Sequence, residues 1–298
     1  MIINSTNLRN LQVAFKAAFQ AAFDGGKVSY DKVATIVPSS TAEETYAWLG
    51  AVPRIREWIG ERVIRNLSTQ GYAIRNRSWE MTVEVPRERI DDDQYGVYAP
   101  MMAEMGRETK VHPDELVFTL LKAGFSTNCF DGQYFFDTDH PVIGEDGIAQ
   151  SVSNMQAGTG PAWFLIDASR VIKPLIFQER RKAEFVAKDD PQTSDEVFMR
   201  NNFIYGAYAR YNVGFGFWQM AIGSKAALTR ENLRDARQRM RGFKADGGRP
   251  LSLNPTHLVV GPQNENAARD IVLSDRLANG QSNTDFKLVE IIESTWLD

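Results

Sequence analysis

The residues with the clearest potential for chemistry stand together at Asp137-Thr138-Asp139-His140. Two carboxylates and one imidazole within four residues could hold a divalent metal ion, as in a metal-dependent enzyme. Aspartate and threonine before a His-Pro pair are also typical of a turn, and the glycines around them predict a loop. We favour the turn and assign no metal site, and a metal-dependent enzyme using Asp137, Asp139 and His140 remains the least favoured alternative.

The single cysteine, Cys129, could in principle be a nucleophile with His140 as its base. No third group that would orient such a base is evident, and a free cysteine is usually a small buried apolar residue. One thiol and three histidines build neither a disulfide nor a Cys-rich zinc site. We therefore predict no catalytic residue and no cofactor.

Two basic segments could contact phosphate or a protein partner. The run 179–182 reads Glu-Arg-Arg-Lys, and carboxylates surround it, which favours a solvated face or a salt bridge between subunits. Four arginines lie on a predicted helix, and we expect them to spread around its circumference, at positions 234, 237, 239 and 241. The motifs GxGxxG, GxxxxGK[ST], HExxH, GxSxG and CxxC do not occur.

Composition indicates an ordinary globular chain with about two domains. It has 298 residues, 43% of them hydrophobic, and 34 basic against 38 acidic residues give a net charge of −4. No apolar run approaches the roughly 18 residues that span a bilayer, and the start does not resemble a signal peptide, so we expect a cytoplasmic protein with no membrane contact. The mild acidity argues against a sequence-specific nucleic-acid reader.

The elements that must position these residues begin with helices in the first 70 residues and continue as a mixture of strands and helices. Residues 7–24 predict an amphipathic helix, because apolar residues recur every three or four positions, at Leu8, Leu11, Phe15, Phe19 and Phe23. Residues 40–50 and 55–67 predict two shorter helices. Residues 100–123 predict either one long helix kinked at Pro113 or two helices in series.

Residues 72–86 predict a long hairpin. The strand at 79–85 alternates, with one apolar face formed by Trp79, Met81, Val83 and Val85. Residues 72–75 would pair back on it through a polar turn at 76–78. Two strands alone bury too little surface to be stable. We therefore expect the hairpin to lie on another surface, with a neighbouring copy of the chain as a natural candidate.

The rest of the chain alternates between strands and helices, which predicts an α+β fold. Residues 130–162 are expected to be irregular. Strands are expected at 163–166, 172–177, 203–217, 257–260 and 286–292, and helices at 229–242, capped by Thr229, and at 264–273.

Long segments of the sequence resemble the major head subunit family of Mu-like phages and prophages. They include TAEETYAWLGAVPRIREWIGER (41–62), YAIRNRSWEMTVEVPRERIDDDQYGVY (72–98), FDGQYFFDTDHP (130–141) and FIYGAYARYNVGFGFWQMA (203–221). Further segments at 163–190, 228–240 and 248–272 extend the resemblance to well over half of the chain. Their length and order make this similarity far more specific than any short motif.

The resemblance implies a tailed-phage major capsid protein of the Hong Kong 97-type fold. It implies an N-terminal arm with connecting helices at 1–60 and an extended-loop hairpin with its base at 61–98. It implies a peripheral domain with a spine helix at 99–165, and a strand-rich middle with an axial domain at 166–298. Its partners would be other copies of the chain in pentamers and hexamers, a scaffold and a protease, a portal and decoration proteins, and packaged double-stranded DNA.

Together these observations predict a non-enzymatic shell protein of a phage virion, assembled in the bacterial cytoplasm. The alternative within the same fold is a nanocompartment shell that encloses a cargo enzyme. Candidate assembly contacts are the arm's phenylalanines, the apolar face of the hairpin and a flexible spine helix, namely Phe15, Phe19, Phe23, Trp79, Met81, Val83, Val85 and Pro113. The phenylalanine stripe would bury against a partner or against the subunit's own domain. On this basis Trp79→Asp or Val83→Asp should block assembly and leave the subunit folded.

Overall fold

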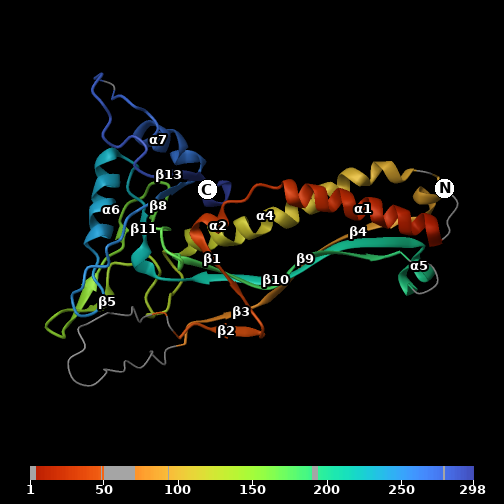
Figure 1. The fold of residues 1–298 in the computed structure, drawn as a ribbon, viewed down its shortest axis with the longest axis horizontal. Coiled ribbons are helices and arrows are strands. Elements are labelled where there is room, and N and C mark those ends of the chain that lie inside the picture. Colours follow the sequence, from red (N-terminus) through yellow and green to blue (C-terminus); the bar gives the residue numbers. More distant parts are fainter. Residues whose placement is uncertain (1–4, 48, 50–70, 93, 190–193, 278) are drawn as a thin grey trace.

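A long arm is built on two 14-residue antiparallel strands, β9 (Leu175–Lys188) and β10 (Asn202–Phe215) (Figure 1). β4 (Arg77–Pro86) pairs antiparallel with the far side of β10, and β1 (Ala34–Pro38) pairs parallel with the start of β9. The sheet order is therefore β1-β9-β10-β4. This computed structural model describes residues 5–47, 49, 71–92, 94–189, 194–277 and 279–298.

Two helices, α1 (Ser5–Gly25) and α4 (Ala99–Ala123), lie side by side along the arm and cover one face of its sheet (Figure 1). They confirm the helices predicted at 7–24 and 100–123, and α4 passes through Pro113 as one element. A Cβ atom placed on Gly106 of α4 would lie 2.2 Å from the backbone oxygen of Phe19 in α1. The missing side chain at this position therefore allows the two helices to approach closely.

A second sheet lies at the other end of the molecule, with strand order β13-β12-β8-β11-β7 (Figure 1). Its central strand β8 is buried at all four positions, as expected for a strand covered on both faces. α6 (Arg230–Gly242) and α7 (Pro262–Val272) pack on it. The five strands are β7 (Met155–Gln156), β8 (Trp163–Ile166), β11 (Ala221–Ser224), β12 (His257–Val260) and β13 (Glu290–Glu293).

Shorter elements connect these two parts. The short helices are α2 (Tyr30–Val33), α3 (Arg87–Asp91), α5 (Asp195–Arg200), η1 (Gln94–Val97), η2 (Trp218–Met220) and η3 (Thr295–Leu297). Two small antiparallel sheets pair β2 (Glu43–Thr45) with β3 (Ala73–Arg75) and β5 (His140–Ile143) with β6 (Ala149–Val152). Helices and largely separate sheets confirm the α+β class, and none of the described helices is long and apolar enough to cross a membrane.

The predicted hairpin at 72–86 is wrong. Residues 73–75 form β3, which pairs with β2, whereas 77–86 form β4, which pairs with β10. Two-residue hairpin turns, and the usual three-residue ones, include a residue with a positive φ angle, and none of residues 76–78 has one. Asn76 is instead buried, and its amide donates hydrogen bonds to the hydroxyl of Ser39 and to the backbone oxygen of Thr41. The chain therefore continues from one sheet into the next.

The predicted helix at 40–50 is also wrong, because part of it is strand β2. The structure has a turn where the helix was expected to begin. The carboxylate of Glu44 accepts hydrogen bonds from the backbone N–H groups of Ser40 at 2.8 Å and Thr41 at 3.1 Å. These bonds lower the pKa of Glu44 to about 2 and close a tight turn before the strand. The helix predicted at 55–67 lies outside the described residues.

The strands differ from expectation in their length, their number and the position of one irregularity. β9 continues to residue 188, far beyond the predicted 172–177, and the last strand shortens from 286–292 to β13. The region 130–162 contains β5, β6 and β7 in place of continuous loop. The expected irregularity in 203–217 occurs as register shifts between Tyr208 and Tyr211, and not at the glycines.

Candidate assembly surfaces

The phenylalanines of α1 face the subunit's own sheet. Phe15 is 1% exposed and meets the ring of Tyr205 edge-on at 5.0 Å. Phe19 is 2% exposed and lies 5.4 Å from the ring of Phe185. These two side chains leave no surface for a neighbour, so of the two alternatives left open by the sequence they bury against the subunit's own domain and not against a partner. Phe23 remains half-buried, with the ammonium of Lys110 5.1 Å from its ring centre.

The apolar face predicted for strand 79–85 exists, but it faces inward. Val85 is fully buried and Val83 packs against the same cluster of α1, α4 and β10 side chains. Trp79 is half-buried against α4, and Met81 is 37% exposed. This correction follows from the pairing of β4 with β10, because a strand beside β10 lies under the helices that cover the sheet. The face stabilises the subunit itself.

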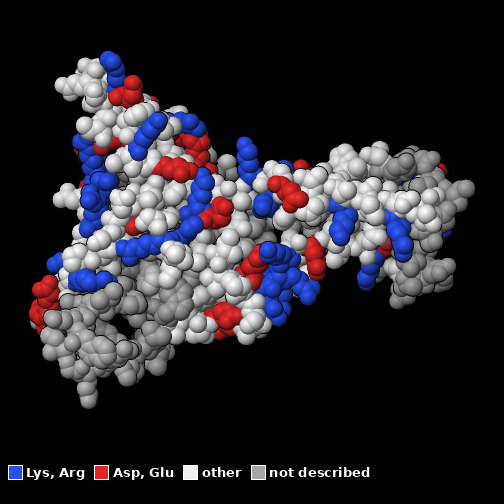
Figure 2. All heavy atoms as spheres, viewed as in Figure 1, with Lys and Arg blue, Asp and Glu red and all other residues white. Residues whose placement is uncertain are grey.

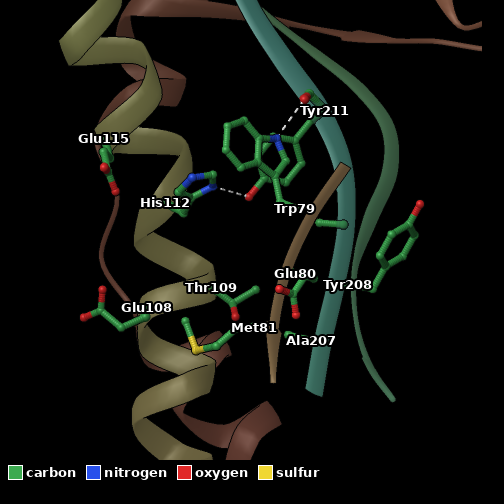
Figure 3. A pocket seen from close by; sticks show the side chains of 11 residues that line it. Trp79, Glu80, Met81, Glu108, Thr109, His112, Glu115, Ala207, Tyr208 and Tyr211 are labelled. Atoms are coloured by element: carbon green, nitrogen blue, oxygen red, sulfur yellow. Dashed lines mark hydrogen bonds between the residues drawn. The ribbon is translucent and has the colours of Figure 1, made fainter. Parts of the chain in front are cut away.

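An aromatic pocket lies between α4 and β4, lined by Trp79, His112, Tyr211 and Met81 (Figure 3). The Trp79 indole N–H donates to the backbone oxygen of Tyr211 at 3.0 Å, and its ring meets the His112 ring edge-on at 4.5 Å. Nδ1 of His112 shares a 2.7 Å hydrogen bond with the Tyr211 hydroxyl. Burial lowers the pKa of His112, with the charge of Glu115 opposing it, so this imidazole is neutral at pH 7.

Carboxylates border the same pocket. Glu108 and Glu115 stand on the α4 side and Glu80 on β4, around a cavity of about 180 Å³ (Figure 3). Sequence reasoning missed the pocket, because its lining comes from β4, α4 and β10, and β10 lies about 100 residues beyond α4 in the sequence. The contact of these segments depends on the sheet order.

Pro113 is buried inside α4. The next residue, Asp114, accepts backbone N–H groups of Ser29 and Tyr30 with its carboxylate, at 2.7–3.1 Å. α4 is thereby tied to the start of α2. The hypothesis that Pro113 is a point of flexure stays a prediction.

The candidate metal ligands Asp137, Asp139 and His140 do not come together. Asp137 accepts the N–H of Thr138 at 2.7 Å where the loop bends, and Asp139 is exposed. His140 is fully buried, and its Nδ1 pairs instead with the carboxylate of Asp131 at 2.7 Å. Sequence reasoning missed Asp131 because it precedes the histidine by nine residues across a loop.

Within the described residues, the histidine, cysteine and carboxylate groups close enough to share a metal ion are Cys129, Asp131 and His140. Hydrogen bonds already satisfy this cluster. The thiol donates to Asp131 at 3.0 Å, Nε2 of His140 lies 3.2 Å from the amide oxygen of Asn154, and the ring stacks on Trp218 at 4.0 Å. Each donor has a protein partner, so these groups act as a structural cluster.

Cys129 is poorly suited to be a nucleophile. Burial, followed by the negative charge of Asp131, raises the pKa of its thiol. Asp131 lies between the thiol and His140, so the imidazole cannot take the thiol proton directly. The chemistry of the nucleophile–base pair considered from the sequence is therefore absent from these three residues.

The arginines of α6 are not spread evenly around the helix. Arg234, Arg237 and Arg241 line one hollow together with Asp285, which corrects the sequence-based expectation. Spacings of three and four residues place them on one helical face. Asp285, which is only 5% exposed, binds Arg230 at 2.6 Å and Arg234 at 2.9 Å. These ion pairs tie α6 to the loop before β13.

Comparison with known proteins decides the family. The family model of the Mu-like prophage major head subunit gpT matches residues 8–297. The chain is 43% identical over 291 residues to the major capsid protein of Escherichia phage Mu, covering 95% of this chain and 94% of that protein. The chain belongs to the Mu-like major head subunit family. It is also 46% identical over 272 residues to the Mu-like prophage FluMu major head subunit of Haemophilus influenzae, covering 89% of this chain and 88% of that one.

Solved structures agree with this assignment to the Mu-like major head subunit family. The subunit of the bacteriophage JBD30 procapsid matches with a TM-score of 0.87 and 47% identity over 99% of this chain and 100% of that one. The JBD30 capsid subunit matches with a TM-score of 0.79 and 36% identity over the full length of both chains. These matches confirm the predicted capsid fold and the structural, non-enzymatic role of a major capsid protein in the virion. They support neither the nanocompartment nor the metal-dependent enzyme.

Proposed function

We propose that copies of this chain, arranged as pentamers and hexamers, close into the icosahedral head shell of a Mu-like tailed phage, around its double-stranded DNA. The observation that carries the proposal is the match to the JBD30 procapsid subunit along nearly the whole chain. The division into an N-terminal arm (1–60), extended loop (61–98), peripheral domain with spine helix (99–165) and axial domain (166–298) belongs to the same proposal.

The form of the subunit supports this function. Helices α1 and α4 cover one face of the long sheet, and the other face is left uncovered by the described helices (Figure 1). Apolar side chains remain exposed along the arm, including Ile36 at 48%, Val186 at 45% and Met101 at 45%. Burying such surface between neighbours provides roughly 25 cal/mol per Å², and many repeated contacts add up over a shell.

The remaining partners are part of the same proposal. A scaffold and a protease act during assembly in the bacterial cytoplasm, a portal admits the DNA, and decoration proteins bind outside. The net charge of −4 fits a container that holds DNA without sequence-specific contacts, because the chain as a whole has no excess of basic groups to bind phosphates tightly.

Expression together with the neighbouring head genes tests the proposal. Sedimentation followed by electron microscopy is expected to reveal closed shells with five-fold and six-fold capsomers. Phe19→Asp is a matched control, because it places a charge in the subunit core and should abolish both folding and shells. A folded wild-type protein that stays a small species in the presence of the scaffold would overturn the proposal.

A further inference from the structure

The two long edges of the arm's sheet carry opposite charges. β4 forms one edge, and the carboxylates around it include Glu80, Glu108 and Glu115, which we call the acidic edge. Arg107 pairs with Glu108 but also with Glu104, at 2.7 Å. Glu80 and Glu115 have no ion pair among the described residues, so this edge keeps a net negative charge.

The opposite edge is the second half of β9, because β1 pairs with β9 only as far as Glu179. Immediately beyond this point lie Arg180, Arg181 and Lys182, which we call the basic run, and all three are exposed. In a regular strand, alternate residues point to opposite faces. Register shifts between β9 and β10 fall on these residues and interrupt that alternation, so that three cations in succession reach solvent.

The basic run is only partly paired with carboxylates of its own subunit. Arg181 pairs with Glu184 at 3.1 Å and lies 5.7 Å from the ring centre of Tyr208. Lys182 has no carboxylate partner among the described residues. Figure 2 shows Lys and Arg side chains gathered beside the middle of the arm, where β3, β9 and β10 lie in Figure 1.

The aromatic pocket at the acidic edge has the chemistry of a receptor for one basic side chain. Trp79 provides an aromatic ring, and Glu80, Glu108 and Glu115 are among the residues that line the pocket. In Figure 3 the Glu80 side chain lies beside β4, whereas the carboxylates of Glu108 and Glu115 extend from the side of α4 that faces away from the rings. A cation over a tryptophan ring gains about 0.5–2 kcal/mol, and the apolar stem of a lysine or arginine packs against residues such as Met81. The neutral His112 adds no competing positive charge.

We propose that the aromatic pocket of one subunit receives a side chain from the basic run of the next copy, with Lys182 entering and Arg180 beside it. The two surfaces lie on opposite edges of one sheet, so the contact joins different surfaces of identical chains. Such a head-to-tail contact repeats around a ring and closes when the rotation permits. The inference rests on the proposed function and identifies one contact within it.

Charged residues on exposed strand edges can also serve only to prevent pairing. A charge exchange separates the two roles, because attraction between copies depends on the sign of each edge, whereas prevention of pairing needs charge of either sign. The acidic-edge variant is Glu108→Lys with Glu115→Lys, and the basic-run variant is Arg180→Glu with Lys182→Glu. The exchanged chain carries all four substitutions and restores opposite signs on the two edges.

Shell yield is measured by sedimentation and electron microscopy after expression with the head genes. Each double variant is expected to lose about tenfold or more of the shells, since like charges in contact are costly, and the exchanged chain should recover most of the wild-type yield. Shells from the wild type show first that the proposed function holds. Wild-type yields from both double variants, or loss in both with no recovery in the exchanged chain, would overturn the inference.

Two controls keep the test independent of folding. Glu231→Lys with Asp270→Lys makes the same change of charge on exposed residues of α6 and α7, away from the arm, and should leave the yield unchanged. Glu108→Gln with Glu115→Gln removes the attraction without adding repulsion. This neutral pair should unfold at the wild-type temperature while requiring several-fold more protein to assemble, and assembly at the wild-type concentration would contradict the inference.

Discussion

Replacing Gly106 by alanine tests the close contact of α1 and α4. Gly106 lies in the interior of α4, where alanine normally stabilises a helix by up to about 1 kcal/mol. Here a Cβ atom would lie 2.2 Å from the backbone oxygen of Phe19 and 3.0 Å from its carbonyl carbon. We therefore expect Gly106→Ala to destabilise the subunit, with the sign opposite to that of helix propensity.

The geometry sets the size of the effect. A carbon–oxygen contact in proteins is about 3.3–3.6 Å, so the two helices must separate by about 1 Å. Overpacking of this kind costs about 1–3 kcal/mol, and the upper end applies because the opposing atom is backbone. Subtracting the gain of about 1 kcal/mol in propensity leaves a loss of about 2 kcal/mol, or about 3 °C in melting temperature for a chain of this size.

Thermal and urea unfolding of the unassembled subunit, followed by circular dichroism, measure this loss. Gly25→Ala is the matched control, because Gly25 is also helical and a Cβ there meets nothing within 4 Å. The control should be as stable as the wild type or gain about 0.4–1 kcal/mol. If Gly106→Ala gained stability like the control, the argument for a close helix contact would be refuted.

Three further predictions concern the interior of the subunit. Trp79→Asp should lower the free energy of unfolding by about 3 kcal/mol, since it removes packing on α4 and the hydrogen bond to Tyr211. A melting temperature equal to that of the wild type would instead support the interface role expected from the sequence. The Cys129 thiol should react with a disulfide reagent roughly tenfold or more slowly in the folded subunit than in urea, because burial raises its pKa, and equal rates would contradict this. Burial raises the pKa of Asp131, but the stronger combined effect of hydrogen bonds from His140 and Cys129 lowers it. A carboxylate whose pKa is lower in the folded state contributes stability above its unfolded pKa near 3.8, and this stability is lost as the pH falls through the folded pKa. Between about pH 5 and 2.5 the urea midpoint should therefore fall less steeply in Asp131→Asn than in the wild type.

Local patterns in the sequence located most helices and the shorter central strands. Apolar residues spaced three and four positions apart identify α1. Thr229 caps α6 as expected, because its side chain accepts the N–H of Asn232. The short strands predicted at 163–166 and 257–260 match β8 and β12. These features depend on neighbours a few residues apart, and for this reason they can be read without the fold.

Partners of the strands could not be read in the same way. The pattern of Trp79, Met81, Val83 and Val85 shows that β4 has one buried face, but not that the buried face lies under its own α4. Residues 72–75 were assigned to the nearest strand, whereas their partner lies about 30 residues earlier in the chain. The alternation of apolar and polar residues shows which face of a strand is buried. Pairing with distant strands determines which surface that face packs against.

The candidate sites follow the same division. Sequence alone identified the family of capsid subunits through long ordered segments, and it favoured a loop over a metal site at Asp137, where the chain bends at Thr138. Only the tertiary structure brought Asp131 to His140 and placed the acidic edge and the basic run on opposite edges of one sheet. The physical reason is that residue type and spacing determine local conformation and burial. The packing of distant segments determines which charges and aromatic rings share a surface.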